Sequence, residues 1–210
     1  MKKTLIVDTT SETLKIAIFN GDKILCNISE KGMVLENFFP AIKRALAYSQ
    51  TDIADIENFY ICQGTGSILG IRCASVALNT FKALGKGKVF YYGLFDVLQK
   101  LIEKTCDKDF YIACPSRKNF LNVCEVKKNE TSKNFEIETK LFEPKDIKVF
   151  YIQQRENSAI ENFKNFEYDI KNIFEILEEN KSLLNEYDIS QDALLLTKKE
   201  YVKWNSQAHI

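Results

Sequence analysis

Two short polar segments carry the side chains and glycines that could do chemistry. Asp8-Thr9-Thr10 follows the apolar run Leu5-Ile6-Val7, where a buried strand would end in a turn. An acidic residue at such a strand end can hold Mg²⁺, while the hydroxyls and amides after it approach a phosphate. Alternatively, these side chains only end the strand and bond to local amides, as short polar residues often do.

The second segment is the glycine-rich stretch Gln63-Gly64-Thr65-Gly66-Ser67, which continues to Gly70 and Arg72. It lies in a predicted strand-to-helix connection, where glycines permit positive φ and leave amides exposed at a helix N-terminus. Such amides can bind an anion, although no Gly-Lys-Ser/Thr follows to make a P-loop. The other interpretation is a tight connection whose glycines let the helix pack closely.

The composition argues against metal, disulfide and direct nucleic-acid binding. Zinc needs clustered ligands, but the only histidine is His209 and no two cysteines form a C-x-x-C pair. The 29 basic and 29 acidic residues cancel, whereas proteins that bind nucleic acid alone usually carry a basic excess. We expect reduced, mostly buried thiols. They are Cys26, Cys62, Cys73, Cys106, Cys114 and Cys124.

No part of the sequence is typical of a signal peptide or a membrane span. Only three apolar residues separate the first lysines from Asp8, and no run approaches the ~18–20 apolar residues of a span. We therefore expect a cytoplasmic protein without a membrane partner. Lys198, Lys199, Lys203 and Trp204 could touch RNA, although a solvated tail is the simpler interpretation.

Hydropathy periods indicate the elements that must position the two polar segments. Asn20-Gly21-Asp22 favours a tight hairpin turn between two alternating strands. An apolar stripe at helical spacing predicts the first helix, with Pro40 in its first turn. Strands are predicted at 3–7, 13–19, 23–29, 58–62 and 88–92, and helices at 36–50, 68–84 and 94–104.

The order β-β-β-α-β-α-β-α is that of the ribonuclease H-like unit, one lobe of the actin/Hsp70/sugar-kinase superfold. By this analogy we predict an α/β fold of the actin-like ATPase superfold, with two small lobes at 1–106 and 107–210. The second lobe is predicted to hold strands at 110–114, 120–127, 135–142 and 147–153, and a helix near 168–181.

The glycine-rich segment also resembles a known family. Q-G-T-G-S-I-L-G-I-R-C-A is similar to the TsaB (YeaZ) signature, commonly written G-P-G-S-F-T-G-L-R-I-G. The opening L-I-V-D-T-T-S-E-T-L-K-I-A-I resembles the family's start, and 35–42 resembles its S-E-x-L-L-P-x-I helix. The resemblance covers about residues 4–85. The matching signature residues are Gly64, Gly66, Ser67, Gly70 and Arg72.

The sequence departs from the family pattern in three places. Thr65, Ile68 and Leu69 stand where the signature has Pro, Phe and Thr. Met33-Val34 replaces a histidine that usually precedes the first helix. The segment 115–122 keeps two basic residues but lacks the acidic ones that usually open the second lobe, so their role is not carried over.

The resemblance implies a non-catalytic subunit for tRNA modification. TsaB pairs with TsaD, which holds ATP and metal and transfers threonylcarbamoyl to the adenosine beside the tRNA anticodon, and TsaE joins them. By resemblance this pseudo-enzyme would need no cofactor, form a homodimer when alone and meet tRNA only indirectly. A chain whose only histidine is His209 cannot build the H-x-x-x-H iron site of TsaD-like proteins. Vestigial nucleotide contacts would fall at Asp8, Thr9, Gly64, Gly66 and Ser67.

By the same resemblance, the helices at 36–50 and 68–84 would form a docking surface. Small residues on the second helix would let a partner helix approach closely, although some of the stripe must face the chain's own sheet. Ala74→Glu would then abolish assembly and leave the monomer folded. The candidate interface residues are Phe38, Phe39, Ile42, Gly70, Arg72, Ala74, Ala77, Leu78 and Phe81.

Two other functions stay open from the sequence alone. An ATP-dependent phosphotransferase or ATPase would use Asp8 and the loop 64–70, but no residue is a candidate for positioning the nucleophile. A diverged TsaB-like protein could instead have lost its partner and persist as a homodimer. Nucleotide titration separates the first alternative from docking, and mixing the chain with TsaD separates the second.

Overall fold

The N-terminal sequence folds into the antiparallel meander that its alternating apolar residues predict. Its strands are β1 (Lys3–Asp8), β2 (Thr13–Asn20) and β3 (Lys23–Lys31). Gly21 takes the positive φ of 57° that the turn between β2 and β3 requires. The computed structural model describes residues 2–11, 13–32, 34–66, 68–85, 87–153, 160, 163 and 165–188, apart from the side chains of residues 34, 35 and 68.

The meander continues into the parallel part of a six-stranded sheet. β1 pairs with β4 (Ile56–Gly64), and β4 pairs with β5 (Lys88–Gly93), both in parallel. A short strand, β10 (Asn185–Glu186), adds to β5 in the antiparallel direction, giving the order β10-β5-β4-β1-β2-β3. Without β10 this is the strand order of the ribonuclease H-like lobe, so the predicted α/β fold of the actin-like superfold is confirmed.

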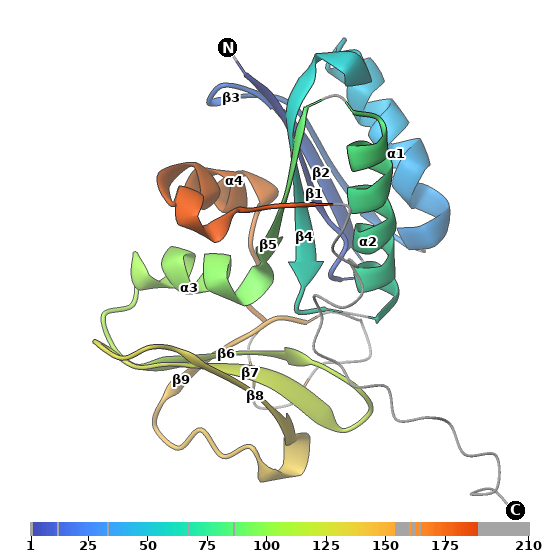
Figure 1. The fold of residues 1–210 in the computed structure, drawn as a ribbon. Helices are drawn as coiled ribbons and strands as arrows, with labels where there is room; N and C mark the ends of the chain where they lie inside the picture. The colour runs from blue at the N-terminus through green and yellow to red at the C-terminus, as the bar shows by residue number, and fades with distance from the viewer. Residues whose placement is uncertain are drawn as a thin grey trace, which may run out of the picture.

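Helices cover both faces of this sheet, because its central strands are apolar on both sides. Leu5 and Val7 of β1 point to the face covered by α1 (Val34–Tyr48) and α2 (Ile68–Ala83). Ile6 packs on the other face. That face is covered by α3 (Leu94–Glu103) and α4 (Ile170–Glu179), as Figure 1 shows. None of the helices in the described ranges has the length and hydropathy that crossing a bilayer takes.

The position of Pro40 in the first helix differs from the prediction. The helix begins at Val34, so Pro40 lies in its interior and not in its first turn. Proline has no N–H to donate to the carbonyl of Glu36, one turn earlier. Both residues are exposed, and water can bond to that carbonyl instead.

A second sheet of four strands forms the other lobe, in the order β8-β7-β6-β9. One of its faces packs against α3 and α4 through Phe110 and Ile112, and the other holds a smaller cluster around Val123. The predicted strand at 135–142 stops at Glu138, because residues 139–141 form a 3₁₀ turn. The strands are β6 (Phe110–Pro115), β7 (Phe120–Val126), β8 (Lys133–Glu138) and β9 (Lys148–Tyr151).

After the second sheet the chain returns to the first lobe. Phe174 of α4 stacks on Phe19 of β2 with ring centroids 3.7 Å apart, and β10 extends the first sheet. Residues 170–186, which the sequence-based division at 106/107 places in the second lobe, therefore lie against the first sheet. The reason is physical: the face of β1 and β2 opposite α1 and α2 needs an apolar cover, which α4 supplies.

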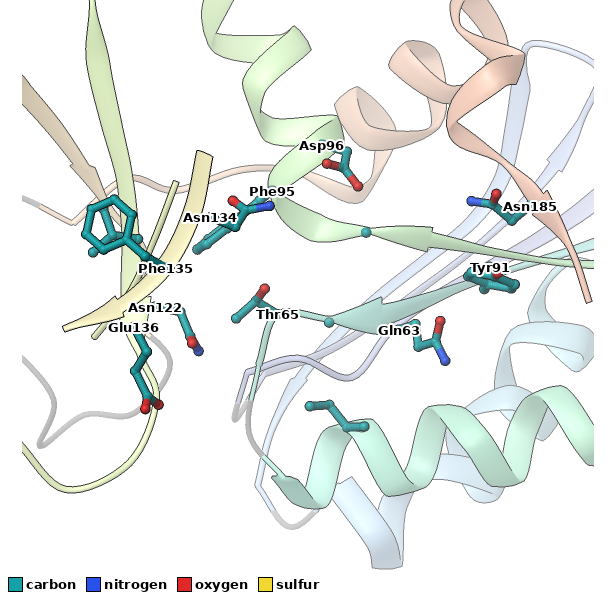
Figure 2. A pocket seen from close by; sticks show the side chains of 14 residues that line it. Gln63, Thr65, Tyr91, Phe95, Asp96, Asn122, Asn134, Phe135, Glu136 and Asn185 are labelled. Atoms are coloured by element: carbon teal, nitrogen blue, oxygen red, sulfur yellow. The ribbon is translucent and has the colours of Figure 1, made fainter. Parts of the chain in front are cut away.

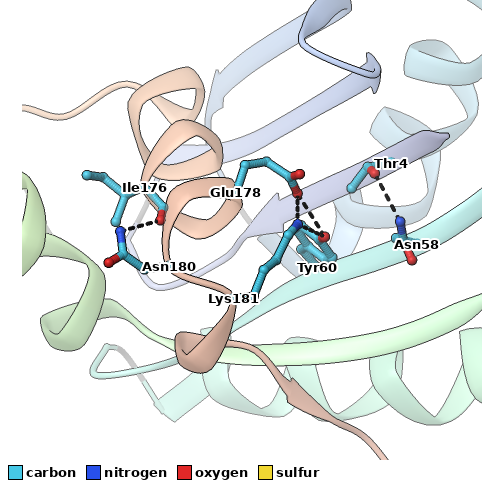
Figure 3. A network of polar contacts seen from close by, with 7 residues as sticks. All are labelled: Thr4, Asn58, Tyr60, Ile176, Glu178, Asn180 and Lys181. Carbon is cyan, nitrogen blue, oxygen red and sulfur yellow. Dashed lines mark hydrogen bonds and ion pairs between the residues drawn. The ribbon is translucent and has the colours of Figure 1, made fainter. Parts of the chain in front are cut away.

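A polar network fastens the C-terminal end of α4 to β4 (Figure 3). The Tyr60 hydroxyl donates to Glu178 Oε1 at 2.9 Å and accepts from Lys181 Nζ at 3.1 Å, and Lys181 also pairs with Glu178. Burial raises the pKa of Tyr60, and its bond to the Glu178 carboxylate raises it further. The returning segment is thus held by both ring stacking and charge-assisted hydrogen bonds.

Phe174→Ala should lower the free energy of unfolding by about 3–5 kcal/mol, because it removes a buried ring and leaves a cavity beside Phe19. Urea denaturation followed by circular dichroism measures this loss. Glu175→Ala, at an exposed position on the same helix, should change stability by less than about 0.5 kcal/mol. Equal losses for the two variants would contradict the packing of α4 on the first sheet.

Candidate functional site

Asp8 lies at the carboxyl end of β1, as predicted, but its side chain is fully buried. Its Oδ1 accepts hydrogen bonds from the Thr10 backbone N at 2.8 Å and from Thr10 Oγ1 at 2.6 Å. Its Oδ2 accepts one from the Tyr168 hydroxyl at 2.7 Å. We call Asp8, Thr10 and Tyr168 the Asp8 network. Both carboxylate oxygens are therefore bound by protein donors inside the fold.

Tyr168 reaches this site from the segment just before α4, 160 positions away in the sequence. Burial raises the pKa of its hydroxyl well above the ordinary value, and the charge of Asp8 raises it further. Lys15, which faces Asp8 across the β1–β2 pair, places its Nζ 3.8 Å from the centre of the Tyr168 ring. No motif marks Tyr168, so sequence reasoning missed it.

Two further polar side chains surround the Asp8 network, Cys62 of β4 and Tyr92 of β5. Burial raises the pKa of the Cys62 thiol well above its ordinary value, with a smaller contribution from Asp8. Burial likewise raises the pKa of Tyr92. Because a thiolate and not a thiol is the nucleophile, this environment disfavours covalent catalysis by Cys62.

The predicted phosphate segment is packed against the end of β1. A Cβ on Gly66 would lie 2.6 Å from Thr10, so only glycine lets this loop approach the turn after β1. Thr9 is buried, and its Oγ1 donates to the Gly70 carbonyl in α2 at 2.9 Å. Gly64 ends β4 with a positive φ of 133°, and it is half-buried, unlike Asp8, Thr9 and Gly66. Ser67 lies outside the described residues.

These contacts fit the interpretation of a tight connection. Thr9 and Gly66 hold the N-terminal end of α2 against the Asp8 network, the first through its hydroxyl hydrogen bond and the second through close packing on Thr10. All six cysteines are unpaired and five are buried, as expected. Within the described ranges no group of three or more His, Cys, Asp and Glu side chains could hold a metal ion.

The proposed interface residues divide into two groups. Phe39 is 46% exposed and Arg72 is also exposed, whereas the others are buried. Each helix needs an apolar stripe for its own sheet, and the buried residues form that stripe; Phe81, for example, stacks on Phe59 at 4.5 Å. The buried residues are Phe38, Ile42, Gly70, Ala74, Ala77, Leu78 and Phe81.

The burial of Ala74 changes one sequence-based expectation. Its side chain is fully buried in the core beneath α1 and α2. Glutamate at this position would place an unpaired charge in that core, at a cost far above that of a surface change. The expectation that Ala74→Glu leaves the monomer folded is therefore wrong.

The outer surface of α2 carries two apolar side chains that the sequence-based interface list omitted. Leu69 is 40% exposed and Val76 is 52% exposed, and with Arg72 between them they follow one side of α2. α1 and α2 lie side by side and start at the same end of the sheet (Figure 1). We call Phe39, Leu69, Arg72 and Val76 the docking face. The seven-residue spacing of Leu69 and Val76 was the sequence signal that could have placed both on one side of the helix.

Comparison with known proteins gives a match in structure. No protein-family model and no curated protein matches the sequence. YeaZ from Pseudomonas aeruginosa superposes with a TM-score of 0.63 at 10% identity, over 87% of this chain and 93% of that one. This chain has the YeaZ fold. The sequence-based resemblance to the TsaB (YeaZ) family is thereby confirmed at the level of the fold.

A second solved structure supports the same assignment of the YeaZ fold. It is a protein described by its similarity to the peptidase YeaZ from Pseudomonas aeruginosa, with a TM-score of 0.68 at 11% identity. The match covers 91% of this chain and 97% of that one, so both lobes are included. The shared fold therefore extends well beyond residues 4–85, where the sequence resemblance was found.

Tyr168→Phe should lower the free energy of unfolding near neutral pH by about 1–3 kcal/mol, because it leaves Asp8 Oδ2 without a donor. The deficit should shrink above about pH 10, where Tyr168 of the unfolded wild-type chain ionises while the folded one, with its raised pKa, does not. Urea denaturation at the two pH values measures both effects.

The control is Tyr48→Phe, at a tyrosine that is 70% exposed. It should change stability near neutral pH by less than about 0.5 kcal/mol. A wild-type advantage over Tyr168→Phe that stays the same on both sides of pH 10 would contradict a buried, proton-donating Tyr168.

Proposed function

We propose that this chain is a non-catalytic subunit that binds a related catalytic protein, TsaD, in the threonylcarbamoyl modification of the adenosine next to the tRNA anticodon. The YeaZ fold provides the context for this proposal. The observation that carries it is the state of Asp8, the acidic residue at the first strand end. Both of its oxygens accept hydrogen bonds from Thr10 and Tyr168 inside the fold, where Asp8 is fully buried.

This arrangement supports a non-catalytic role on chemical grounds. Phosphoryl transfer needs an acid that holds the metal, a cradle for the phosphates and a group that positions the nucleophile. The Asp8 carboxylate accepts hydrogen bonds from protein donors, and the buried Gly66 is packed on Thr10. In the proposed complex, ATP and metal belong to TsaD, TsaE joins the assembly, and this chain needs no cofactor.

The docking face offers a surface for such a partner. Protein interfaces draw most of their binding energy from a few central side chains, and aromatic and arginine residues are frequent among them. Phe39 and Arg72 have this character, while Leu69 and Val76 add apolar area. An interface of standard size buries about 1,600 Å² in total, so neighbouring parts of α1 and α2 would also take part.

The remaining parts of the proposal rest on the composition and on the family resemblance. The balanced charge, 29 basic and 29 acidic residues, supports indirect contact with tRNA through the partner. The same docking face would pair two copies when TsaD is missing, which gives a homodimer in the isolated state. The cytoplasm, where tRNA is modified, is the proposed location.

Val76→Glu should weaken binding to TsaD of the same organism by about 30-fold or more, because it places a charge among the apolar side chains of the docking face. The monomer should stay folded, since Val76 is 52% exposed. Co-purification and calorimetric titration with TsaD measure the effect. The matched control is Leu141→Glu, at an equally apolar position in the second lobe that is 60% exposed, which should bind normally.

Normal binding of TsaD by Val76→Glu would contradict the docking face. A wild-type chain that forms a homodimer but ignores TsaD would favour a diverged protein without the partner.

Isolated wild-type chain should neither bind Mg²⁺·ATP tightly nor hydrolyse it, because the Asp8 carboxylate is fully buried and both of its oxygens already accept hydrogen bonds from the protein. Calorimetric titration and phosphate release measure the two properties. Turnover of ATP by the purified chain, lost on Asp8→Asn, would replace the docking proposal with an ATPase.

A further inference from the structure

A cleft of about 570 Å³ lies between the two lobes, and its volume is typical of sites for small molecules. Figure 2 shows Gln63, Thr65, Tyr91, Asp96 and Asn185 on the side of the first lobe. On the opposite side are side chains from the second sheet, Asn122, Asn134, Phe135 and Glu136. The Asp8 network is not part of this lining, whereas Gly64, one of the predicted nucleotide contacts, is.

Two glycines form the part of the wall where parallel strands end. Gly64 of β4 and Gly93 at the end of β5 are paired neighbours in the sheet, and both line the cleft. In open α/β sheets, ligands bind outside the carboxyl ends of the strands. A Cβ on Gly93 would lie 2.4 Å from Asp96 Oδ2, so glycine leaves the space that this carboxylate occupies.

The charged side chains in the described lining of the cleft are all acidic. The described residues that line the cleft include two carboxylates, Asp96 and Glu136, and no lysine, arginine or histidine. Glu136 is neutralised from outside the cleft by Arg117 Nη2 at 3.2 Å, and it also accepts a hydrogen bond from Ser116. Asp96 makes no comparable ion pair or hydrogen bond to a side chain of the described ranges.

Asp96 is therefore the charge in the cleft that lacks a counter-ion. Asp96 is exposed to solvent, and partial desolvation by the neighbouring walls raises the pKa of its carboxyl, because the charged form loses hydration. It lies in the first turn of α3, where its negative charge offsets the positive end of the helix dipole. The dipole by itself would favour an anion, and Asp96 opposes it. What favours a cation at this wall is the carboxylate of Asp96 in a lining whose described residues include no basic side chain.

We propose that the interlobe cleft binds a small organic cation, an amine or a guanidine, whose charged group pairs with Asp96. The amides of Asn134 and Asn185 provide hydrogen-bonding groups around it, and Phe95 and Ile71 provide apolar contact for its carbon chain. A charge-assisted hydrogen bond of an ammonium or guanidinium to a carboxylate is among the stronger polar contacts in proteins. This site is independent of the docking face.

Agmatine, which carries both an ammonium and a guanidinium group, is the probe. Calorimetric titration of the full chain should show one site, and Asp96→Asn should raise its Kd about tenfold or more. The matched control is Glu57→Gln, at an exposed carboxylate near the opposite end of β4, which should leave the Kd unchanged. Mg²⁺·ATP should show no binding at the same concentrations.

Two measurements on wild-type chain keep the test independent of variant folding. Amide resonances of Gly64 and Gly93 should shift when agmatine is added, because both residues line the cleft. The affinity should fall as the pH is lowered through the pKa of the Asp96 carboxyl, which is raised above its ordinary value, since the protonated acid cannot pair with a cation.

Failure of agmatine to bind wild-type chain, or equal affinity for wild type and Asp96→Asn, would overturn the proposal. Val76→Glu should bind agmatine like wild type, so this site and the docking face can fail separately.

Discussion

The buried carboxylate of Asp8 is the constraint around which the first lobe is organised. A charged group taken out of water is costly unless its lone pairs are bound, and here Thr10 and Tyr168 bind them. Thr10 lies in the turn that packs on Gly66, and Tyr168 begins the return of the chain to the first sheet. One carboxylate thus joins β1, the start of α2 and the segment that leads into α4.

The same requirement explains how the returning segment is positioned. Tyr168 alone would be a single hydrogen bond, but α4 adds the Phe174–Phe19 stack and the bonds of Lys181 and Glu178 to Tyr60. Burial of this helix covers the second face of the sheet, while α1 and α2 cover the first face and carry exposed apolar side chains such as Val76 on their outer side. Within this architecture the acid at the end of β1 supports the structure through its internal hydrogen bonds.

Much of the fold could be predicted because it depends on local periodicity. The alternation of β2, the Asn20-Gly21 turn and the apolar stripes of the helices each depend on residues close in sequence. The glycine-rich segment was also recognisable locally, since the close approach of Gly66 to Thr10 requires a residue without a side chain. The fold class followed from these signals. Helix α4 was predicted at the right place in the sequence but in the wrong lobe, because an apolar stripe shows that one side of a helix is buried and does not show which element covers it.

The sequence by itself determined the strand and helix order, the α/β class, the resemblance to the TsaB (YeaZ) family and the strand-end position of Asp8, because these are written in patterns a few residues long. Only the tertiary structure decided that Tyr168 closes Asp8, that Ala74 is core while Val76 is surface, and that Asp96 faces a cleft across from Glu136. Those outcomes depend on contacts between segments far apart in the chain. A helix with two apolar sides shows its inner one only when the sheet beneath it is in place.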